Sequence, residues 1–174
     1  SIPVGLPDDI YKQIIAFTKQ KGCQVVLDAS GEGFREALTA VPALVKPNID
    51  ELQEFCGHSL NSQAEVIGAA RRLIDQGLQT VVVSMGEKGA LFVDNAEVIR
   101  AIPPKVQVKS TVGAGDAMLS GMVAGKIENR SLKGCARLAT AFSIVAVTHI
   151  GAGLPPATSL DSIECQVQLD EIKT

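Results

Sequence analysis

Apolar residues along the 174-residue chain recur with two spacings, one typical of amphipathic helices and one typical of buried strands. The first helical segment lies between Pro7 and Gly22. Its apolar face is formed by Ile10, Ile14, Ile15 and Phe17. The same spacing predicts further helices at residues 34–40, 50–55, 66–74, 115–125 and 131–150. Short apolar runs predict strands at residues 24–28, 43–45, 80–84, 90–93, 97–101 and 106–108.

Helices and strands therefore alternate, which favours an α/β layered fold with a mostly parallel sheet. The segment 24–28 is typical of a parallel strand, because strands covered on both faces are continuously apolar. Asp94 and Asn95 separate two strands in the manner of a hairpin. The last twenty residues are weakly patterned, with one short element expected around Ile163, Val167 and Leu169. A chain of 174 residues is of the length of one domain, so we predict a single domain over residues 1–174.

Composition and charge exclude several classes of protein. Lys and Arg number 16 against 19 Asp and Glu, a net charge of −3, and aromatic residues make up 3% with no Trp. This balance argues against a nucleic-acid partner. The apolar runs are too short to span a bilayer, and the first residues lack the basic start of a signal peptide. Four widely spaced cysteines fit neither a disulfide framework nor a metal site, so we expect a cytoplasmic protein.

The segment 110–116, Ser-Thr-Val-Gly-Ala-Gly-Asp, carries the strongest chemical signal. Its small residues Gly113, Ala114 and Gly115 allow backbone N–H groups to point into one concavity at the start of a helix. Such oriented donors, together with the positive end of the helix dipole, stabilise an anion. Asp116 in the first turn is favoured in its ionised form and is suited to accept a proton. The alternative is a glycine turn whose aspartate only caps the helix.

A second polar segment, 46–51, directly follows the strand at 43–45. Lys46 is suited to contact a phosphate, and Glu51 is suited to hold Mg²⁺ through water. Asn48 and Glu51 also have the spacing of a capping box, so a purely structural role is the alternative.

A third segment, 84–89, has the sequence Ser-Met-Gly-Glu-Lys-Gly and ends the strand at 80–84. Ligands of open α/β sheets bind outside the carboxyl ends of strands, which makes this a place for a nucleotide phosphate or ribose. The alternative is that its two glycines simply form a turn.

Other motifs of chemical interest are absent from the sequence. His58 and His149 lack the spacing of a metal site or a triad, and no Walker A, G-x-S-x-G or Rossmann G-x-G-x-x-G motif occurs. The missing Rossmann motif argues against a dinucleotide-dependent oxidoreductase, which would share the α/β class. The segment 28–33 follows a strand and suits a cleft wall, although loop chemistry explains it equally well.

Taken together, these segments resemble the ribokinase-like sugar kinases of the phosphofructokinase-B family. Residues 110–123 match the family's second signature, in which Gly-Ala-Gly-Asp precedes a helix of small residues. Asn48-x-x-Glu51 resembles the family's magnesium motif, and the segment 84–89 its nucleotide loop. The resemblance implies a three-layer α/β/α fold and weakens only after about Pro156.

Within the family, the chain is similar to the branch that acts on ketohexose phosphates. The Asp-Ala-Ser-Gly-Glu of residues 28–32 and the Ser-Thr-Val before Gly-Ala-Gly-Asp carry this similarity. The branch contains 1-phosphofructokinase, tagatose-6-phosphate kinase and a minor 6-phosphofructokinase. It implies ATP-dependent phosphorylation of fructose 1-phosphate, tagatose 6-phosphate or fructose 6-phosphate to the bisphosphate, and the residues leave that choice open.

The resemblance also implies roles for individual residues. Asp116 would accept the proton of the sugar hydroxyl, while the amides of Gly113, Ala114, Gly115 and Asp116 would hold the transferring phosphoryl group. Glu51, helped by Asn48, would place Mg²⁺ on the phosphates. The residues implied to bind ATP are Lys46, Asn48, Ser84, Met85, Gly86, Glu87, Lys88, Gly89, Val108, Thr140 and Ile144. Family members often bind a monovalent cation, for which the candidates are Ser110, Val112, Ala146, His149 and Gly151.

Members of the family are longer than this chain, whose first residues resemble the middle of a family loop. The sequence is therefore similar to the C-terminal part of a kinase domain, without the first strands, the lid and most sugar contacts. We expect that part alone to turn over poorly, and the family's lid implies a homodimer in the complete protein. The alternative function is a regulatory module that binds a nucleotide without catalysis.

Overall fold

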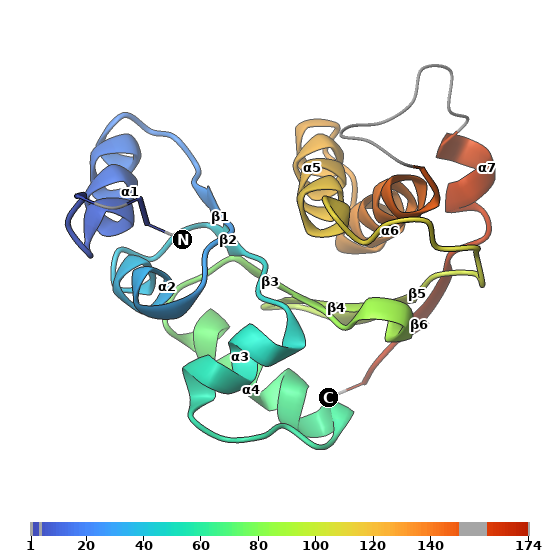
Figure 1. Cartoon of the computed structure of the whole chain (residues 1–174), viewed down its shortest axis with the longest axis horizontal. Coiled ribbons are helices and arrows are strands. Elements are labelled where there is room, and N and C mark those ends of the chain that lie inside the picture. The colour runs from blue at the N-terminus through green and yellow to red at the C-terminus, as the bar shows by residue number, and fades with distance from the viewer. Residues whose placement is uncertain (1, 4, 150–159, 174) are drawn as a thin grey trace. The chain divides into compact units, whose positions relative to one another are not determined.

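The computed structural model describes residues 2–3, 5–149 and 160–173 and contains two compact units (Figure 1). The first unit comprises Ser1–Val83 with Val93–Ala96, and the second comprises Ser84–Phe92 with Glu97–Thr174. The strands of the sheet are, in spatial order, β1 (Val26–Leu27), β2 (Leu44–Val45), β3 (Thr80–Ser84), β4 (Ala90–Asp94), β5 (Val98–Ile102) and β6 (Gln168–Glu171). The α/β class predicted from the sequence is confirmed.

The first unit is built from parallel strands joined by helices. Strand β1 pairs in parallel with β2, and β2 with β3. Helix α1 (Ile10–Gln20) precedes β1, α2 (Gly31–Leu38) connects β1 to β2, and α3 (Ile49–Cys56) and α4 (Gln63–Asp75) connect β2 to β3. The side chains of Leu44, Val45 and Val81 are fully buried, as expected of parallel strands with both faces covered.

Helix α1 does not bury the whole apolar face that its spacing predicts. The face in contact with α2 carries Tyr11, whose ring lies beside Gly33, and Ile15, one turn further on. Ile14 and Phe17 are 49% and 62% exposed. The hydrophobic face therefore extends beyond the surface that α2 covers.

The second unit pairs two helices of small residues. It contains the short 3₁₀ turn η1 (Gly86–Lys88) and the helices α5 (Ala114–Ile127), α6 (Leu132–Thr148) and α7 (Leu160–Glu164). Helices α5 and α6 lie side by side (Figure 1). Gly121 makes this possible, because a Cβ there would lie 2.7 Å from Ala139 Cα. A Cβ at Gly125 would lie 2.9 Å from Cys135 Sγ. The helices therefore approach more closely than larger residues would allow.

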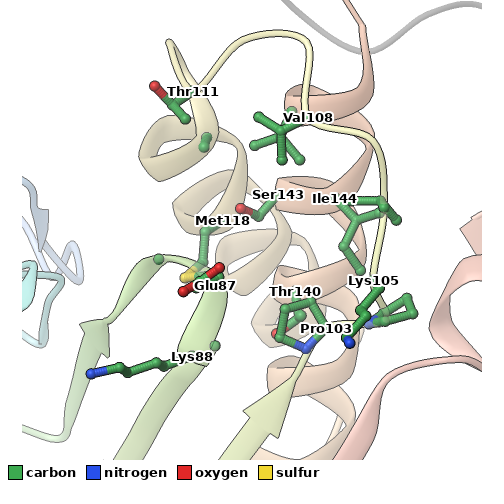
Figure 2. A pocket seen from close by; sticks show the side chains of 16 residues that line it. Glu87, Lys88, Pro103, Lys105, Val108, Thr111, Met118, Thr140, Ser143 and Ile144 are labelled. Atoms are coloured by element: carbon green, nitrogen blue, oxygen red, sulfur yellow. The ribbon is translucent and has the colours of Figure 1, made fainter.

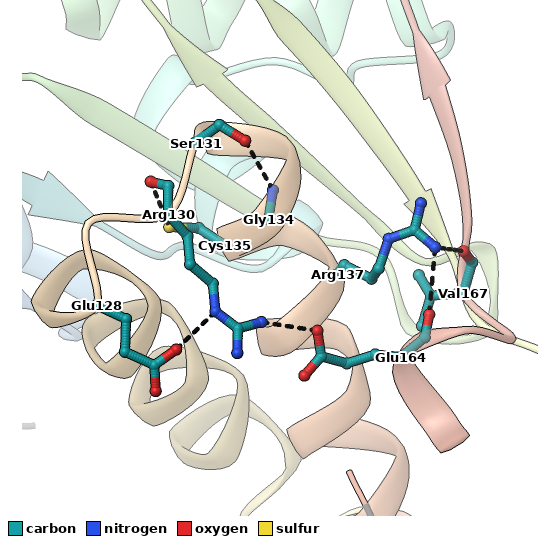
Figure 3. Close-up of polar contacts among 8 residues, drawn as sticks. All are labelled: Glu128, Arg130, Ser131, Gly134, Cys135, Arg137, Glu164 and Val167. Carbon is teal, nitrogen blue, oxygen red and sulfur yellow. Dashed lines mark hydrogen bonds and ion pairs between the residues drawn. The ribbon is translucent and has the colours of Figure 1, made fainter. Parts of the chain in front are cut away.

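A network of charged side chains holds the end of the chain against this helix pair (Figure 3). Arg130, in the turn after α5, donates to Glu128 at 2.6 Å and to Glu164 of α7 at 2.7 Å. Arg137 of α6 donates to the carbonyl oxygens of Glu164 and Val167, both at 3.4 Å. Strand β6 then pairs antiparallel with β5. The weakly patterned end of the sequence is thus a helix and a strand rather than one short element.

The strand predicted at 106–108 is wrong. Pro103 and Pro104 lack a backbone N–H, so the sheet pairing of β5 ends at Ile102. Val106 and Val108 are exposed, and the segment has no strand partner within the described chain. Its alternating valines imitate a strand but line a pocket instead. Among the helices that the structure describes, none is both long and apolar enough to cross a membrane.

Candidate active site

The start of α5 presents an exposed carboxylate and backbone donors that have no acceptor among the described residues. Gly113 has φ +80°, a conformation that favours glycine, and it precedes the first helical residue. The amides of Gly113, Gly115 and Asp116 donate to no acceptor in the part of the chain that the structure describes. The Ala114 amide donates to the Thr111 carbonyl at 3.3 Å, so three of the four predicted donors are available. An anion at this helix terminus would find both donors and a favourable dipole.

The Asp116 side chain does not cap the helix. It is exposed, and it forms no hydrogen bond or ion pair with any described residue. Besides the bonds of the helix, Ser120 Oγ donates to the Asp116 carbonyl oxygen at 2.8 Å, and no other described residue bonds to Asp116. No described residue therefore occupies the Asp116 carboxylate or the amides of Gly113, Gly115 and Asp116, and a ligand could contact them together.

A pocket of about 680 Å³ adjoins this helix start within the second unit (Figure 2). Its volume is within the range of sites that bind small molecules and cofactors. The lining residues are Gly86, Glu87, Lys88, Gly89, Pro103, Pro104, Lys105, Val106, Val108, Thr111, Ala114, Met118, Thr140, Ser143, Ile144 and Val147. Because Thr111 and Ala114 belong to this lining, one end of the pocket reaches the first turn of α5.

The turn after β3 forms one wall of the pocket through a tight approach of two backbones. Gly89 has φ +87°, and a Cβ at this position would lie 2.0 Å from the Ala101 carbonyl oxygen. Only glycine fits there. The turn is closed by a hydrogen bond of 2.8 Å from the Met85 amide to the Gly89 carbonyl. The segment 84–89 therefore forms the turn given as the structural alternative, and its residues 86–89 also line the pocket, so a structural role and a ligand-binding role are compatible.

The opposite wall comes from the loop after β5 and from α6. The amides of Lys109 and Ser110 donate to the Val147 carbonyl at 2.7 and 3.3 Å and fix the end of the loop on α6. Val108 is 54% exposed. Apolar side chains of the loop and of α6 thus form a surface suited to a flat heterocycle.

The predicted polar residues of segment 46–51 lie in the first unit. Lys46 is only 5% exposed, and its Nζ lies 3.1 Å from Asp28 Oδ2, so its charge is matched at the ends of β1 and β2. Asn48 and Glu51 form a complete capping box: Asn48 Oδ1 accepts from the Glu51 amide at 2.9 Å, and Glu51 Oε2 from the Asn48 amide at 2.8 Å. The structural alternative considered for this pair is therefore realised.

A magnesium ion is compatible with this cap. The second carboxylate oxygen of Glu51 has no partner among the described residues. Mg²⁺ in kinase sites is held by one or two carboxylates together with water and substrate phosphates, so one free carboxylate oxygen fits. No cluster of three or more His, Cys, Asp or Glu that would enclose a metal is found in the described chain.

The predicted site residues thus fall into three sets. The pocket brings together Gly86, Glu87, Lys88, Gly89, Val108, Ala114, Thr140 and Ile144. Gly113, Gly115 and Asp116 belong to the adjoining helix start, whereas Ser84 and Met85 precede the pocket wall. Lys46, Asn48 and Glu51 belong to the other unit. Two of the cation candidates contact the end of α6. The Ser110 amide donates to the carbonyl of Val147, the residue after Ala146, and His149 Nδ1 lies 2.9 Å from the Val145 carbonyl oxygen. Gly151 is outside the described residues.

Several residues that line the pocket were not predicted from the sequence to bind a ligand: Pro103, Pro104, Lys105, Val106, Thr111, Met118, Ser143 and Val147. Helical spacing offered a signal for three of them. Met118 lies one turn after Ala114, while Ser143 and Val147 lie three and seven residues after Thr140 and so share its face. The residues of the loop at 103–106 gave no comparable signal, because the sequence pattern around two prolines does not specify which other segments the loop contacts.

Comparison with known proteins adds independent information. The sequence pattern of pfkB family carbohydrate kinases matches residues 1–159. The chain is 42% identical over 163 residues to a 1-phosphofructokinase from Rhodobacter capsulatus. The aligned region covers 94% of this chain and 52% of the relative. It therefore spans about half the length of the curated relatives it matches.

Two solved structures are similar in fold. The crystal structure of phosphofructokinase-2 from Escherichia coli in complex with potassium is 34% identical, with a TM-score of 0.88 over 94% of this chain and 54% of that one. The structure of Arabidopsis thaliana ribokinase complexed with ribose and ATP is 27% identical, with a TM-score of 0.79 over 91% of this chain and 53% of that one. These similarities confirm the ribokinase-like architecture expected from the sequence.

Proposed function

The chain belongs to the pfkB family of carbohydrate kinases, and from this membership we propose that it provides the site of phosphoryl transfer from ATP to a ketohexose phosphate. The observation that carries the proposal is the arrangement at the start of α5. The amides of Gly113, Gly115 and Asp116 and the Asp116 carboxylate have no partner among the described residues, and they adjoin a pocket large enough for a nucleotide. Phosphoryl transfer requires such positioning and charge neutralisation rather than covalent participation by the protein.

In the proposed mechanism, the nucleotide base occupies the pocket and the phosphates extend toward the start of α5. The three free amides hold the negative charge of the transferring phosphoryl group, and the helix dipole adds to this stabilisation. Asp116 accepts the proton of the attacking sugar hydroxyl, for which its carboxylate has no competing partner in the described chain. Mg²⁺, when bound, would supply positive charge to the phosphates. Glu51, one oxygen of which has no partner among the described residues, is the residue proposed to hold it through water.

The proposal names a class of acceptor rather than one sugar. Fructose 1-phosphate, tagatose 6-phosphate and fructose 6-phosphate all fit it. The relative from Rhodobacter capsulatus favours fructose 1-phosphate. Residues 1–174 form the C-terminal part of one kinase domain in this proposal, which acts in the cytoplasm and as a homodimer. The Escherichia coli phosphofructokinase-2 structure is a complex with potassium, which supports a monovalent cation in this proposal. Its candidate neighbours are Ser110, Val112, Ala146 and His149.

A kinase assay of the intact protein with each of the three sugar phosphates tests the proposal. We expect Asp116→Asn to lower turnover at least ~100-fold, the lower range for losing a general base. The affinity for MgATP should change little, because Asp116 does not line the pocket. Asp161→Asn, which alters an aspartate in the first turn of α7, is the matched control and should leave turnover unchanged.

Two outcomes would contradict the proposal. Normal turnover of Asp116→Asn would remove this residue from the mechanism. Binding of ATP without phosphorylation of any of the three sugars by the intact protein would favour the regulatory module considered above.

A further inference from the structure

Residues 160–172, which comprise α7 and β6, form a strap that ion pairs hold against the start of α6. Arg130, in the turn before α6, lies 2.7 Å from Glu164 of α7, measured from Nη1 to Oε2 (Figure 3). Lys133, in the first turn of α6, lies 2.6 Å from Glu171 of β6, measured from Nζ to Oε2. Each of the two elements of the strap therefore has an ionic contact with this part of the chain.

The strap is also held against β5. Strand β6 pairs antiparallel with β5 over four residues, with Ile102 opposite Gln168 at the end of β5. The Ile172 amide continues this pairing with a hydrogen bond of 2.9 Å to the Val98 carbonyl oxygen. The strap therefore connects α6 to β5.

The two elements that the strap connects also build the pocket. Thr140, Ser143 and Val147 of α6 line the pocket. Pro103 and Pro104, which directly follow β5, line it as well. No residue of the strap belongs to the pocket lining. The strap is thus placed to set the separation of two pocket-forming elements without contacting a ligand in the pocket.

Few apolar contacts hold the strap in place. Val167 alone is buried within residues 160–172, and α7 contains no buried residue. The side chains of Lys133 and Glu171 are about half exposed, whereas that of Glu164 is only 13% exposed. Segments with few buried apolar contacts open at a lower free energy than the fold as a whole. We therefore expect the strap to open locally, and dissolved salt to weaken the ion pairs that hold it.

We infer that the strap is a conformational device coupled to the pocket: the pocket binds its ligand while the strap is closed on α6 and β5, and loses that affinity when the strap opens. This inference rests on the proposed function, which places MgATP in the pocket. A ligand that binds only the closed form shifts the equilibrium toward that form. MgATP therefore closes the strap from a distance, since no strap residue lines the pocket.

Hydrogen exchange in the intact protein tests this coupling. The amides of Val167 and Ile172 donate to the carbonyls of Glu164 and Val98, so their exchange reports opening of the strap. In the ligand-free protein they should exchange faster than the amides of the buried strand β3. MgATP at ~100 times its Kd should slow their exchange by up to ~100-fold, the ratio expected when only the closed form binds.

Glu164→Gln tests the ionic contact, because glutamine keeps the shape of the side chain without its charge. The strap amides of the ligand-free variant should exchange about 3- to 10-fold faster than in the wild type, the effect of one weakened hydrogen bond. High salt should also speed their exchange in the wild type, and by a smaller factor in the variant. Glu36→Gln is the matched control: Glu36 pairs with Lys12 of α1 at 3.7 Å, and its loss should leave strap exchange unchanged.

The possible results separate this inference from the proposed function. If MgATP binds and slows exchange in α6 but not in the strap, the inference is overturned while the kinase proposal stands. Ligand-free strap amides that exchange as slowly as those of β3 would also overturn it, since the strap would then open only with the whole fold. Unchanged strap exchange in Glu164→Gln would overturn the role of the ion pair. If the wild type binds no MgATP at all, the proposed function fails and the coupling fails with it.

Discussion

At the scale of single residues, one side chain can serve two roles that a sequence pattern does not separate. Asn48 and Glu51 have the spacing of both a helix cap and a magnesium motif, and the structure shows the cap with bonds of 2.8 and 2.9 Å. One oxygen of Glu51 remains without a partner among the described residues. A carboxylate has two oxygens, so capping and metal binding are compatible.

Glu51→Gln distinguishes the two roles, because glutamine also completes a capping box but carries no charge for a cation. We expect the Mg²⁺ concentration needed for half-maximal kinase activity to rise about tenfold or more, the range for a weakened metal site. The thermal unfolding temperature should change little. An unchanged magnesium titration would assign Glu51 to capping alone.

A buried cysteine is a second example at this scale. Cys135 of α6 lies against Gly125 of α5, and burial raises the pKa of its thiol. A thiol that stays protonated is a weak nucleophile. The residue therefore packs the helix pair and takes no part in the chemistry that we propose.

At the scale of secondary-structure elements, small residues set how closely α5 and α6 approach. The sequence of α5 contains no broad polar face, and its apolar and small residues are spread around the helix. Gly121 and Gly125 face α6, so the start of α5 is held by packing rather than by an amphipathic pattern. The position of the unpaired amides depends on this packing.

Gly121→Ala tests this packing. The added Cβ would lie 2.7 Å from Ala139 Cα and 3.0 Å from the Leu138 carbonyl oxygen, so the helices must move apart. We expect the free energy of unfolding to fall by about 1–3 kcal/mol, as for other overpacked contacts. Urea denaturation measures this change.

Gly68→Ala in α4 is the matched control. Gly68 is also helical, and a Cβ added there would have no described atom of a neighbouring element within 4 Å. Alanine at this position should raise the free energy of unfolding by about 0.4–1 kcal/mol, because the unfolded chain loses conformational freedom. Equal stabilisation by both substitutions would show that α5 and α6 are not limited by contact at Gly121.

At the scale of the whole molecule, pH acts on stability through ion pairs. Lys133 of α6 donates to Glu171 of β6 at 2.6 Å, and both side chains are about half exposed. The hydrogen bond from Lys133 lowers the pKa of Glu171 below its ordinary value, and the same bond raises the pKa of Lys133. The pair therefore stabilises the fold at pH values between these two titrations.

Glu171→Gln measures this contribution. In the wild type, the stabilisation is present above the ordinary glutamate pKa and is lost as pH falls through the lowered one. It is also lost as pH rises through the raised pKa of Lys133. We expect the variant to have a slightly lower urea midpoint at neutral pH, because exposed pairs contribute little. The difference should vanish in strong acid and in high salt; a difference that persists in both would exclude an ion-pair origin.

The helices and strands could be predicted from the sequence where the spacing of apolar residues was regular. The strand over residues 80–84 has the predicted bounds, and the helix at 115–125 extends by one residue at its start and two at its end. The alternation of apolar and polar residues at 106–108 predicted a strand that does not form, because Pro103 and Pro104 prevent the backbone pairing that a strand requires. The exposure of Ile14 and Phe17 likewise depends on which face of α1 meets α2.

The sequence by itself determined the α/β class, the glycine-rich helix start with Asp116 and the capping residues, because each depends on neighbours in the chain. Tertiary structure alone decided that the segments 86–89, 103–108 and 140–147 line one pocket, since residues so far apart meet only through folding. It also decided that the Thr140 hydroxyl is buried without a partner among the described residues. A sequence specifies which groups are available, while folding specifies which of them remain unpaired.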